Sequence, residues 1–74
     1  MMLTDNQRDI LINMDDWLGS LSAVDYWNLM GEFEHGELGV WNIVVSTYTR
    51  KRVFKKDIPI LNKLYNIYEK EIQK

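Results

Sequence analysis

The stretch GVWNIVVSTYTRKRVFKK, residues 39–56, decides the fold, because its composition suits a strand while its spacing suits a helix. Its β-branched and aromatic residues are common in sheets. However, the adjacent Val44 and Val45 would face opposite ways in a strand, and no second strand with a turn signal follows. A strand here would need the same strand of a second subunit as its partner. As a helix, the segment has one apolar stripe, formed by Leu38, Trp41, Val44, Val45 and Tyr48, so we predict a helix over residues 38–51.

The residues before this stretch predict two more helices. Thr4 and Gln7 match a capping box, and apolar residues then recur at helical spacing up to Gly19, a natural stop, which predicts a helix over 4–18. Ser22 begins a second capping signature, which predicts a helix over 22–34. Apolar side chains cover nearly all of its wheel except Asp25, Asn28 and Glu32, so we expect it to be the central, buried helix.

The last segment predicts a fourth helix over 57–73. Asp57 can cap it, and Pro59 is tolerated in the first turn, where an amide hydrogen has no intrahelical partner. Two adjacent apolar stripes then fill about half of the wheel. We therefore predict an all-α fold, with four helices in a compact orthogonal or bundle-like array, and a single domain over residues 1–74.

A chain of 74 residues has a thin core, since such a domain buries only about 60% of its unfolded surface. It contains no cysteine, which excludes disulfides and thiolate zinc sites. Large aromatic side chains are the alternative source of burial. Trp17, Trp27 and Trp41 fall one per predicted helix, so they either meet in a shared core or leave part of their surface for a partner.

The composition also indicates where the protein works. The first residues, MMLTDNQRDI, lack a basic region followed by an apolar one, and no stretch approaches the roughly 20 apolar residues of a membrane span. We therefore expect a cytoplasmic protein with no membrane partner. The chain is rich in Asn, Ile, Lys, Tyr and Met, residues of AT-rich codons, which suggests a low-GC bacterium, its phage or a mobile element.

The charges are unevenly distributed along the chain. Residues 1–38 have eight acids and one base, a net charge of −7, whereas residues 39–74 have eight bases and three acids, a net charge of +5. The two halves either neutralise each other in the fold or present a charged surface to a partner.

Two acidic clusters are candidates for chemistry. Glu32, Glu34, His35 and Glu37 contain metal-binding groups, but their spacing does not place two ligands on one helix face, and a solvated loop explains them better. The adjacent Asp15 and Asp16 point about 100° apart on a helix, so they would not converge on one bond. We expect a solvated face there, and we expect no enzyme activity, no metal and no cofactor.

A basic run follows the predicted third helix and is formed by Arg50, Lys51, Arg52, Lys55 and Lys56. Such a run can neutralise phosphates, with Tyr48 or Phe54 stacking on bases, or it can simply complement the helix dipole. The preceding helix has Trp, Val and Tyr where a recognition helix would have Arg, Asn, Gln and Ser. Registers of a helix-turn-helix with Gly36 or Gly39 in the turn also match poorly. A small DNA-binding regulator is therefore our alternative hypothesis.

The preferred hypothesis is a non-enzymatic interaction or regulatory domain. Ile12, Val40 and Ile43 lie off the main apolar stripes, so with Tyr48 they could form an exposed apolar-aromatic patch flanked by charge. We predict that this patch binds a protein partner, which includes a second copy of the chain in a homodimer.

Overall fold

The stretch that decides the fold forms a helix. The computed structural model describes residues 1–34 and 39–73, and within it residues Gly39–Arg50 form helix α3. Val40, Val44 and Thr47 of α3 are completely buried. The segment is therefore the inner helix of the molecule, and the alternative of a strand paired with a second subunit does not hold.

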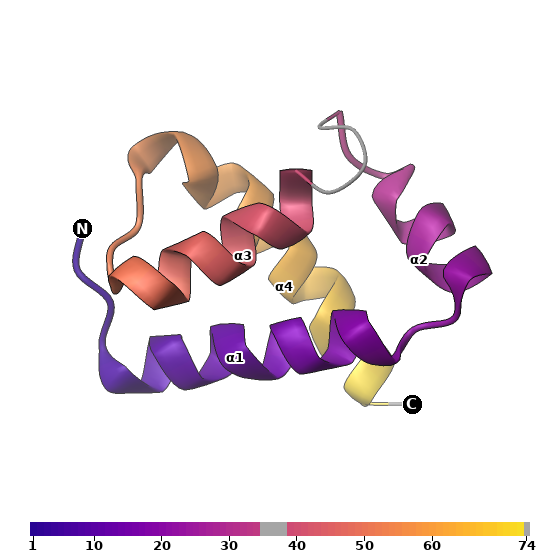
Figure 1. The fold of residues 1–74 in the computed structure, drawn as a ribbon, viewed down its shortest axis with the longest axis horizontal. Coiled ribbons are helices and arrows are strands. Elements are labelled where there is room, and N and C mark those ends of the chain that lie inside the picture. The colour runs from indigo at the N-terminus through magenta and orange to yellow at the C-terminus, as the bar shows by residue number, and fades with distance from the viewer. Residues whose placement is uncertain (35–38, 74) are drawn as a thin grey trace.

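The three other predicted helices also form, so the predicted all-α fold with four helices is confirmed over the described residues. They are α1 (Asp5–Ser20), α2 (Ala23–Met30) and α4 (Ile58–Ile72), and a short 3-10 turn, η1 (Lys55–Asp57), precedes α4. Figure 1 shows α3 running antiparallel to α1, with α4 crossing behind them. The radius of gyration is 11.7 Å, close to the roughly 11 Å expected for a compact chain of this length. None of the described helices combines the length and the apolar character needed to cross a membrane.

The core is formed where α1, α3 and α4 meet. Each helix contributes one apolar stripe, and the fully buried side chains are Met14, Leu18, Val40, Val44, Thr47 and Leu64. Two of the three tryptophans, Trp17 and Trp41, are half-buried and pack against this core. Trp27 instead has 53% of its surface exposed, so the three indoles do not share one core.

The predicted start of α1 is confirmed. The Thr4 hydroxyl accepts a hydrogen bond from the Gln7 amide at 3.1 Å, and the Gln7 side chain accepts one from the Thr4 amide at 3.0 Å. The predicted stop at Gly19 is wrong, since α1 continues to Ser20 and ends when Leu21 becomes extended. Gly19 keeps a helical backbone with a negative φ, so nothing forces the chain to leave the helix there.

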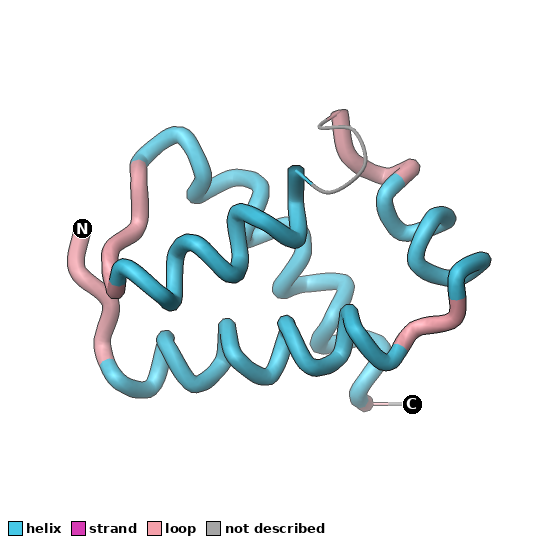
Figure 2. The backbone as a smooth tube through the Cα atoms, viewed as in Figure 1, coloured by secondary structure: helices cyan, strands magenta, loops and turns pink. Residues whose placement is uncertain are grey.

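The prediction that the second helix is central is also wrong. Helix α2 has only eight residues, and Val24 is 69% exposed. Figure 2 shows it at the edge of the molecule, between two loops. Only its stripe of Tyr26, Leu29 and Met30 is buried. Apolar residues around the whole wheel therefore did not mean burial from all sides, because a short helix at the edge needs only one stripe to attach it.

The chain leaves α3 through an unusual residue. Lys51 adopts the left-handed conformation with φ 59°, which commonly terminates a helix. The following residues then lie beside the N-terminal segment in a single antiparallel bridge between Met2 and Arg52. The Leu3 amide donates to the Lys51 carbonyl at 3.1 Å, and the Val53 amide donates to the Met1 carbonyl at 2.7 Å. This short pairing fixes the path of the loop that carries the basic run.

Asp15 joins α1 to α3. Its two carboxylate oxygens accept hydrogen bonds from the Trp41 indole and the Tyr48 hydroxyl, each at 2.6 Å. Trp41 and Tyr48 lie two turns apart on one face of α3. In addition, the Arg8 guanidinium donates to the Tyr48 carbonyl at 3.2 Å. The expectation that Asp15 lies on a solvated face is therefore wrong, because the carboxylate is half-buried against α3, whereas its neighbour Asp16 is exposed.

We expect Asp15→Ala to lower the free energy of unfolding by about 2–3 kcal/mol, because a hydrogen bond to a charged group contributes about 1.5–3 kcal/mol and two donors lose their acceptor. Asp16→Ala, which removes an exposed carboxylate from the next residue, should change it by less than about 0.5 kcal/mol. Urea unfolding followed by circular dichroism measures both. Equal effects of the two substitutions would contradict this role for Asp15.

Candidate functional site

The four residues predicted to bind a partner do not form one patch. Val40 is completely buried and belongs to the hydrophobic core, so the prediction that it lies on the surface is wrong. Tyr48 lies at the α1–α3 contact, where its carbonyl accepts from Arg8 and its hydroxyl donates to Asp15, whereas Ile12 of α1 is half-buried. Ile43 is half-buried and lines a groove between α3 and α4 with Phe54.

The basic run divides into one structural residue and four exposed ones. The Arg50 guanidinium donates to the Arg52 carbonyl at 2.9 Å, pairs with Asp57 at 3.4 Å and stacks 3.8 Å from the Phe54 ring centre. Asp57 is buried and caps no helix through its side chain, so the predicted cap is replaced by this ion pair. The other bases of the run, Lys51, Arg52, Lys55 and Lys56, are exposed on one loop.

The possible metal cluster is only partly described. Glu32 and Glu34 are exposed, whereas His35 and Glu37 lie outside the described residues. Among the residues that the structure does describe, no three metal-binding side chains come together.

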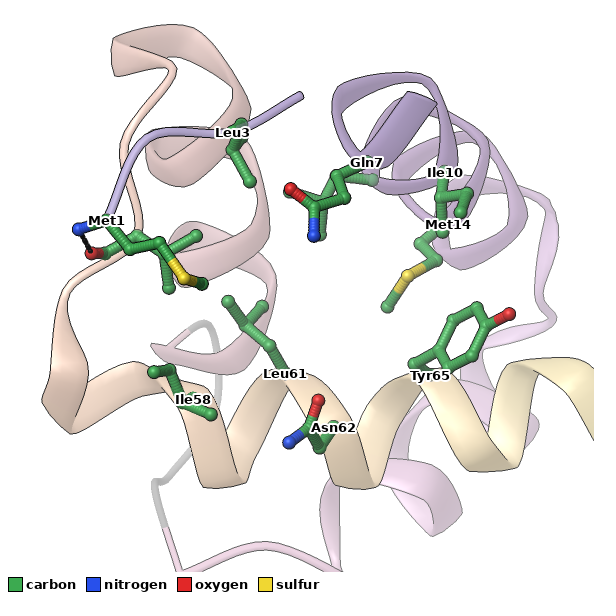
Figure 3. A pocket seen from close by; sticks show the side chains of 11 residues that line it. Met1, Leu3, Gln7, Ile10, Met14, Ile58, Leu61, Asn62 and Tyr65 are labelled. Atoms are coloured by element: carbon green, nitrogen blue, oxygen red, sulfur yellow. Dashed lines mark hydrogen bonds between the residues drawn. The ribbon is translucent and has the colours of Figure 1, made fainter. Parts of the chain in front are cut away.

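An apolar groove lies between the N-terminal segment, α1 and α4. Figure 3 shows Leu3, Ile10, Leu61 and Tyr65 around it, and its volume is about 320 Å³. Gln7, Asn62 and Tyr65 supply its polar side chains, and the ammonium group of Met1 donates to the Val53 carbonyl at 3.1 Å. We call it the N-terminal groove. None of its described lining side chains is charged, so it offers mainly apolar contact area.

A second groove lies where the C-terminal ends of α1 and α4 meet α2. Its volume is about 660 Å³, and it is lined by Trp17, Leu21, Asp25, Asn28, Leu29, Glu32, Ile67 and Glu71. The apolar members come from all three helices, and the described lining includes three acids and no base. We call it the acidic groove, because an apolar surface there is combined with negative charge.

The negative potential of the acidic groove comes from its carboxylates and not from the helix ends. Leu21 of the groove is the residue at which α1 ends, and α1 has no base in its last turn. However, α2 begins two residues later, and its first turn contains Asp25, so the negative end of α1 lies beside the positive end of α2. Asp25, Glu32 and Glu71 are therefore the groups in the lining that favour a cationic ligand.

The acidic groove was not predicted from the sequence, although one signal pointed to it. Asp25, Asn28 and Glu32 were recognised as the polar strip of the second helix. That strip forms one wall of the groove, but the other walls come from α1 and α4, at the far ends of those helices. Only the tertiary structure shows that Trp17 and Ile67 lie beside the strip.

We compared the chain with protein-family models, with curated proteins and with solved structures, and none of the three comparisons found a match. The candidate site therefore rests on the geometry and charge of this chain's own residues.

Tyr48 gives a titratable readout of the α1–α3 contact. The hydrogen bond to Asp15, followed by burial, raises the pKa of the Tyr48 hydroxyl above its usual value of 10.0. Burial raises the pKa of Tyr26, and a hydrogen bond to Glu69 raises that of Tyr65. These folded-state pKa values lie above the unfolded value, so their stabilising contribution is complete below about pH 10 and is lost as the pH rises through them.

We expect the unfolding free energy to fall as the pH rises above about 10, and Asp15→Asn to lower the pKa of Tyr48 toward its usual value. An ultraviolet titration of tyrosinate, with Tyr48→Phe used to assign the signal, measures the shift. Asp9→Asn is the control, because Asp9 does not contribute to the pKa of Tyr48. A Tyr48 titration unchanged by Asp15→Asn would contradict the hydrogen bond.

Proposed function

We propose that this protein is a non-enzymatic interaction domain whose acidic groove binds a basic, amphipathic segment of a protein. The observation that carries the proposal is the combination of apolar residues from three helices with Asp25 and Glu32 at one groove. An amphipathic helix that docks in a groove uses apolar anchors for affinity. Opposite charges at the rim then provide orientation and faster association.

The degrees of burial in the groove fit this role. Trp17, Leu21 and Ile67 are half-buried, so each keeps apolar surface that a partner would cover. Asp25, Asn28 and Glu32 are exposed and can reach the cations of a docked segment. Trp17 is also held in place by an edge contact with Tyr68 at 5.4 Å between ring centres, so it is a preorganised contact surface.

The composition supports a setting for this activity. We propose that the protein acts in the cytoplasm of a low-GC bacterium, as a product of the host, a phage or a mobile element, and that it regulates the protein it binds. The support is the abundance of residues with AT-rich codons and the small size of the chain.

We expect a labelled helical peptide with Lys on one face and Leu and Phe on the other to bind, with an affinity that falls as salt is raised. Asp25→Asn with Glu32→Gln should weaken binding about three- to tenfold, because an exposed ion pair contributes about 0.2–1 kcal/mol. Fluorescence anisotropy of the peptide measures the affinity.

The matched control is Asp9→Asn with Asp16→Asn, which removes two exposed acids from residues that do not line the acidic groove. It should leave the peptide affinity within about twofold of the wild type. If both double variants weaken binding equally, or if an acidic peptide binds as well as the basic one, the acidic groove is not the binding site.

A second candidate function is nucleic-acid binding by the loop. The supporting observation is that Lys51, Arg52, Lys55 and Lys56 are all exposed on one short segment, beside the ring of Phe54, which is 42% exposed. Cations next to an aromatic ring can contact phosphates while the ring stacks on a base. We leave Arg50 out of this proposal, because it pairs with Asp57 and stacks on Phe54.

For nucleic-acid binding we expect a labelled DNA duplex to be retained at low salt, with affinity falling steeply as salt rises. Lys55→Gln with Lys56→Gln should weaken retention, whereas Lys63→Gln with Lys70→Gln, the same charge change on α4, should not. Anisotropy measures both. Absence of retention at low salt would exclude this candidate function.

A further inference from the structure

The exposed basic loop has the properties of a ligand for the acidic groove. We define the basic loop as residues 51–56. Phe54 has 42% of its surface exposed, and the cations of Arg50 and Lys56 lie 3.8 and 5.9 Å from its ring centre. The neighbouring acid, Asp57, is buried and paired with Arg50, so it leaves the charges of Lys55 and Lys56 for another partner. The loop thus combines one apolar anchor with several cations.

The loop and the groove cannot meet within one molecule. Figure 1 shows the loop after α3 at the same end as the N-terminus, while α2 and the C-terminal end of α4 lie at the opposite end. The molecule is 33 Å long on its longest axis. A contact between these two surfaces therefore requires two copies of the chain.

We propose that the acidic groove binds the basic loop of a second copy, with Phe54 against Trp17, Leu21 and Ile67. Lys55 and Lys56 would then face Asp25 and Glu32. This inference rests on the proposed function, since it names the occupant of the same groove. The two surfaces differ, so the contact is head-to-tail, and each added copy exposes a new free loop and a new free groove.

The loop is already held in shape for such a contact. Arg50 donates a hydrogen bond to the Arg52 carbonyl, pairs with Asp57 and stacks on the Phe54 ring. The antiparallel bridge between Met2 and Arg52 connects the loop to the N-terminal segment. A preorganised loop loses little conformational entropy on binding. One loop in one groove nevertheless buries less area than a standard interface, so the contact is weak and appears at high protein concentration.

Sedimentation velocity over about a hundredfold range of protein concentration tests the inference. We expect the average mass to rise with concentration and to fall when salt is added. Lys55→Glu with Lys56→Glu should keep the protein monomeric over this range, and so should Asp25→Lys with Glu32→Lys. Asp9→Asn with Asp16→Asn should assemble like the wild type.

Mixing the two monomeric variants gives the most specific result. The groove variant keeps an intact loop, the loop variant keeps an intact groove, and the reversed charges of the two variants are opposite to each other. The mixture should therefore regain the concentration-dependent assembly that each variant alone lacks. Circular dichroism checks that each variant is folded. If one of them is not, the peptide TRKRVFKK, residues 49–56, replaces it and should bind the wild type, whereas the same peptide with Phe54→Ala should bind at least about tenfold more weakly.

The outcomes separate this inference from the proposed function. A wild type that stays monomeric but binds the Lys, Leu and Phe peptide overturns the second copy as occupant and leaves the groove as a binding site for other proteins. A protein that neither assembles nor binds that peptide overturns both. Assembly that persists in the groove variant or at high salt uses another surface, and it also overturns the inference.

Discussion

The structure depends on the contact between α1 and α3, which the carboxylate of Asp15 stabilises by accepting hydrogen bonds from Trp41 and Tyr48. The described core is small and the chain contains no cysteine, so the placement of the inner helix depends on a few strong contacts. Val40, Val44 and Thr47 supply the burial. Asp15 fixes the orientation of α3, because it accepts hydrogen bonds from Trp41 and Tyr48, which lie two turns apart on α3. These two bonds set the rotation and the register of α3 against α1. Charge-assisted hydrogen bonds are suited to this, since they are strong and geometrically specific.

The two surfaces of functional interest follow from this arrangement. Since α1, α3 and α4 already form the core, α2 is attached by one stripe only and leaves the acidic groove open against the ends of α1 and α4. At the other end, α3 ends at Arg50, and the following loop is held by the pair of Arg50 with Asp57 and by the buried side chain of Val53, while its lysines and Arg52 stay exposed. The strong charge asymmetry of the chain is thus only partly neutralised within the fold. We propose that the charges left exposed, on the basic loop and the acidic groove, pair between two molecules.

Much of the fold could be predicted from the sequence, because its signals are local. The capping box at Thr4, the apolar stripe around Val44 and the two stripes of α4 each predict a helix without reference to the rest of the chain. The functional surfaces were less predictable because they depend on tertiary contacts. Asp15 and Asp16 are equivalent as adjacent acids, and only the position of Trp41 and Tyr48 distinguishes them. Likewise Val40 lies off the stripe that faces α1, yet it is buried because α3 is covered on more than one side.

The most direct test of this architecture is native-state hydrogen exchange measured residue by residue by NMR. If α3 is the inner helix, the amides of Val44 and Thr47 should exchange only through global unfolding, while those of Trp27 and Asn28 in α2 should exchange faster through local opening. Protection of α2 equal to or greater than that of α3 would contradict the central position of α3 and the attachment of α2 by a single stripe.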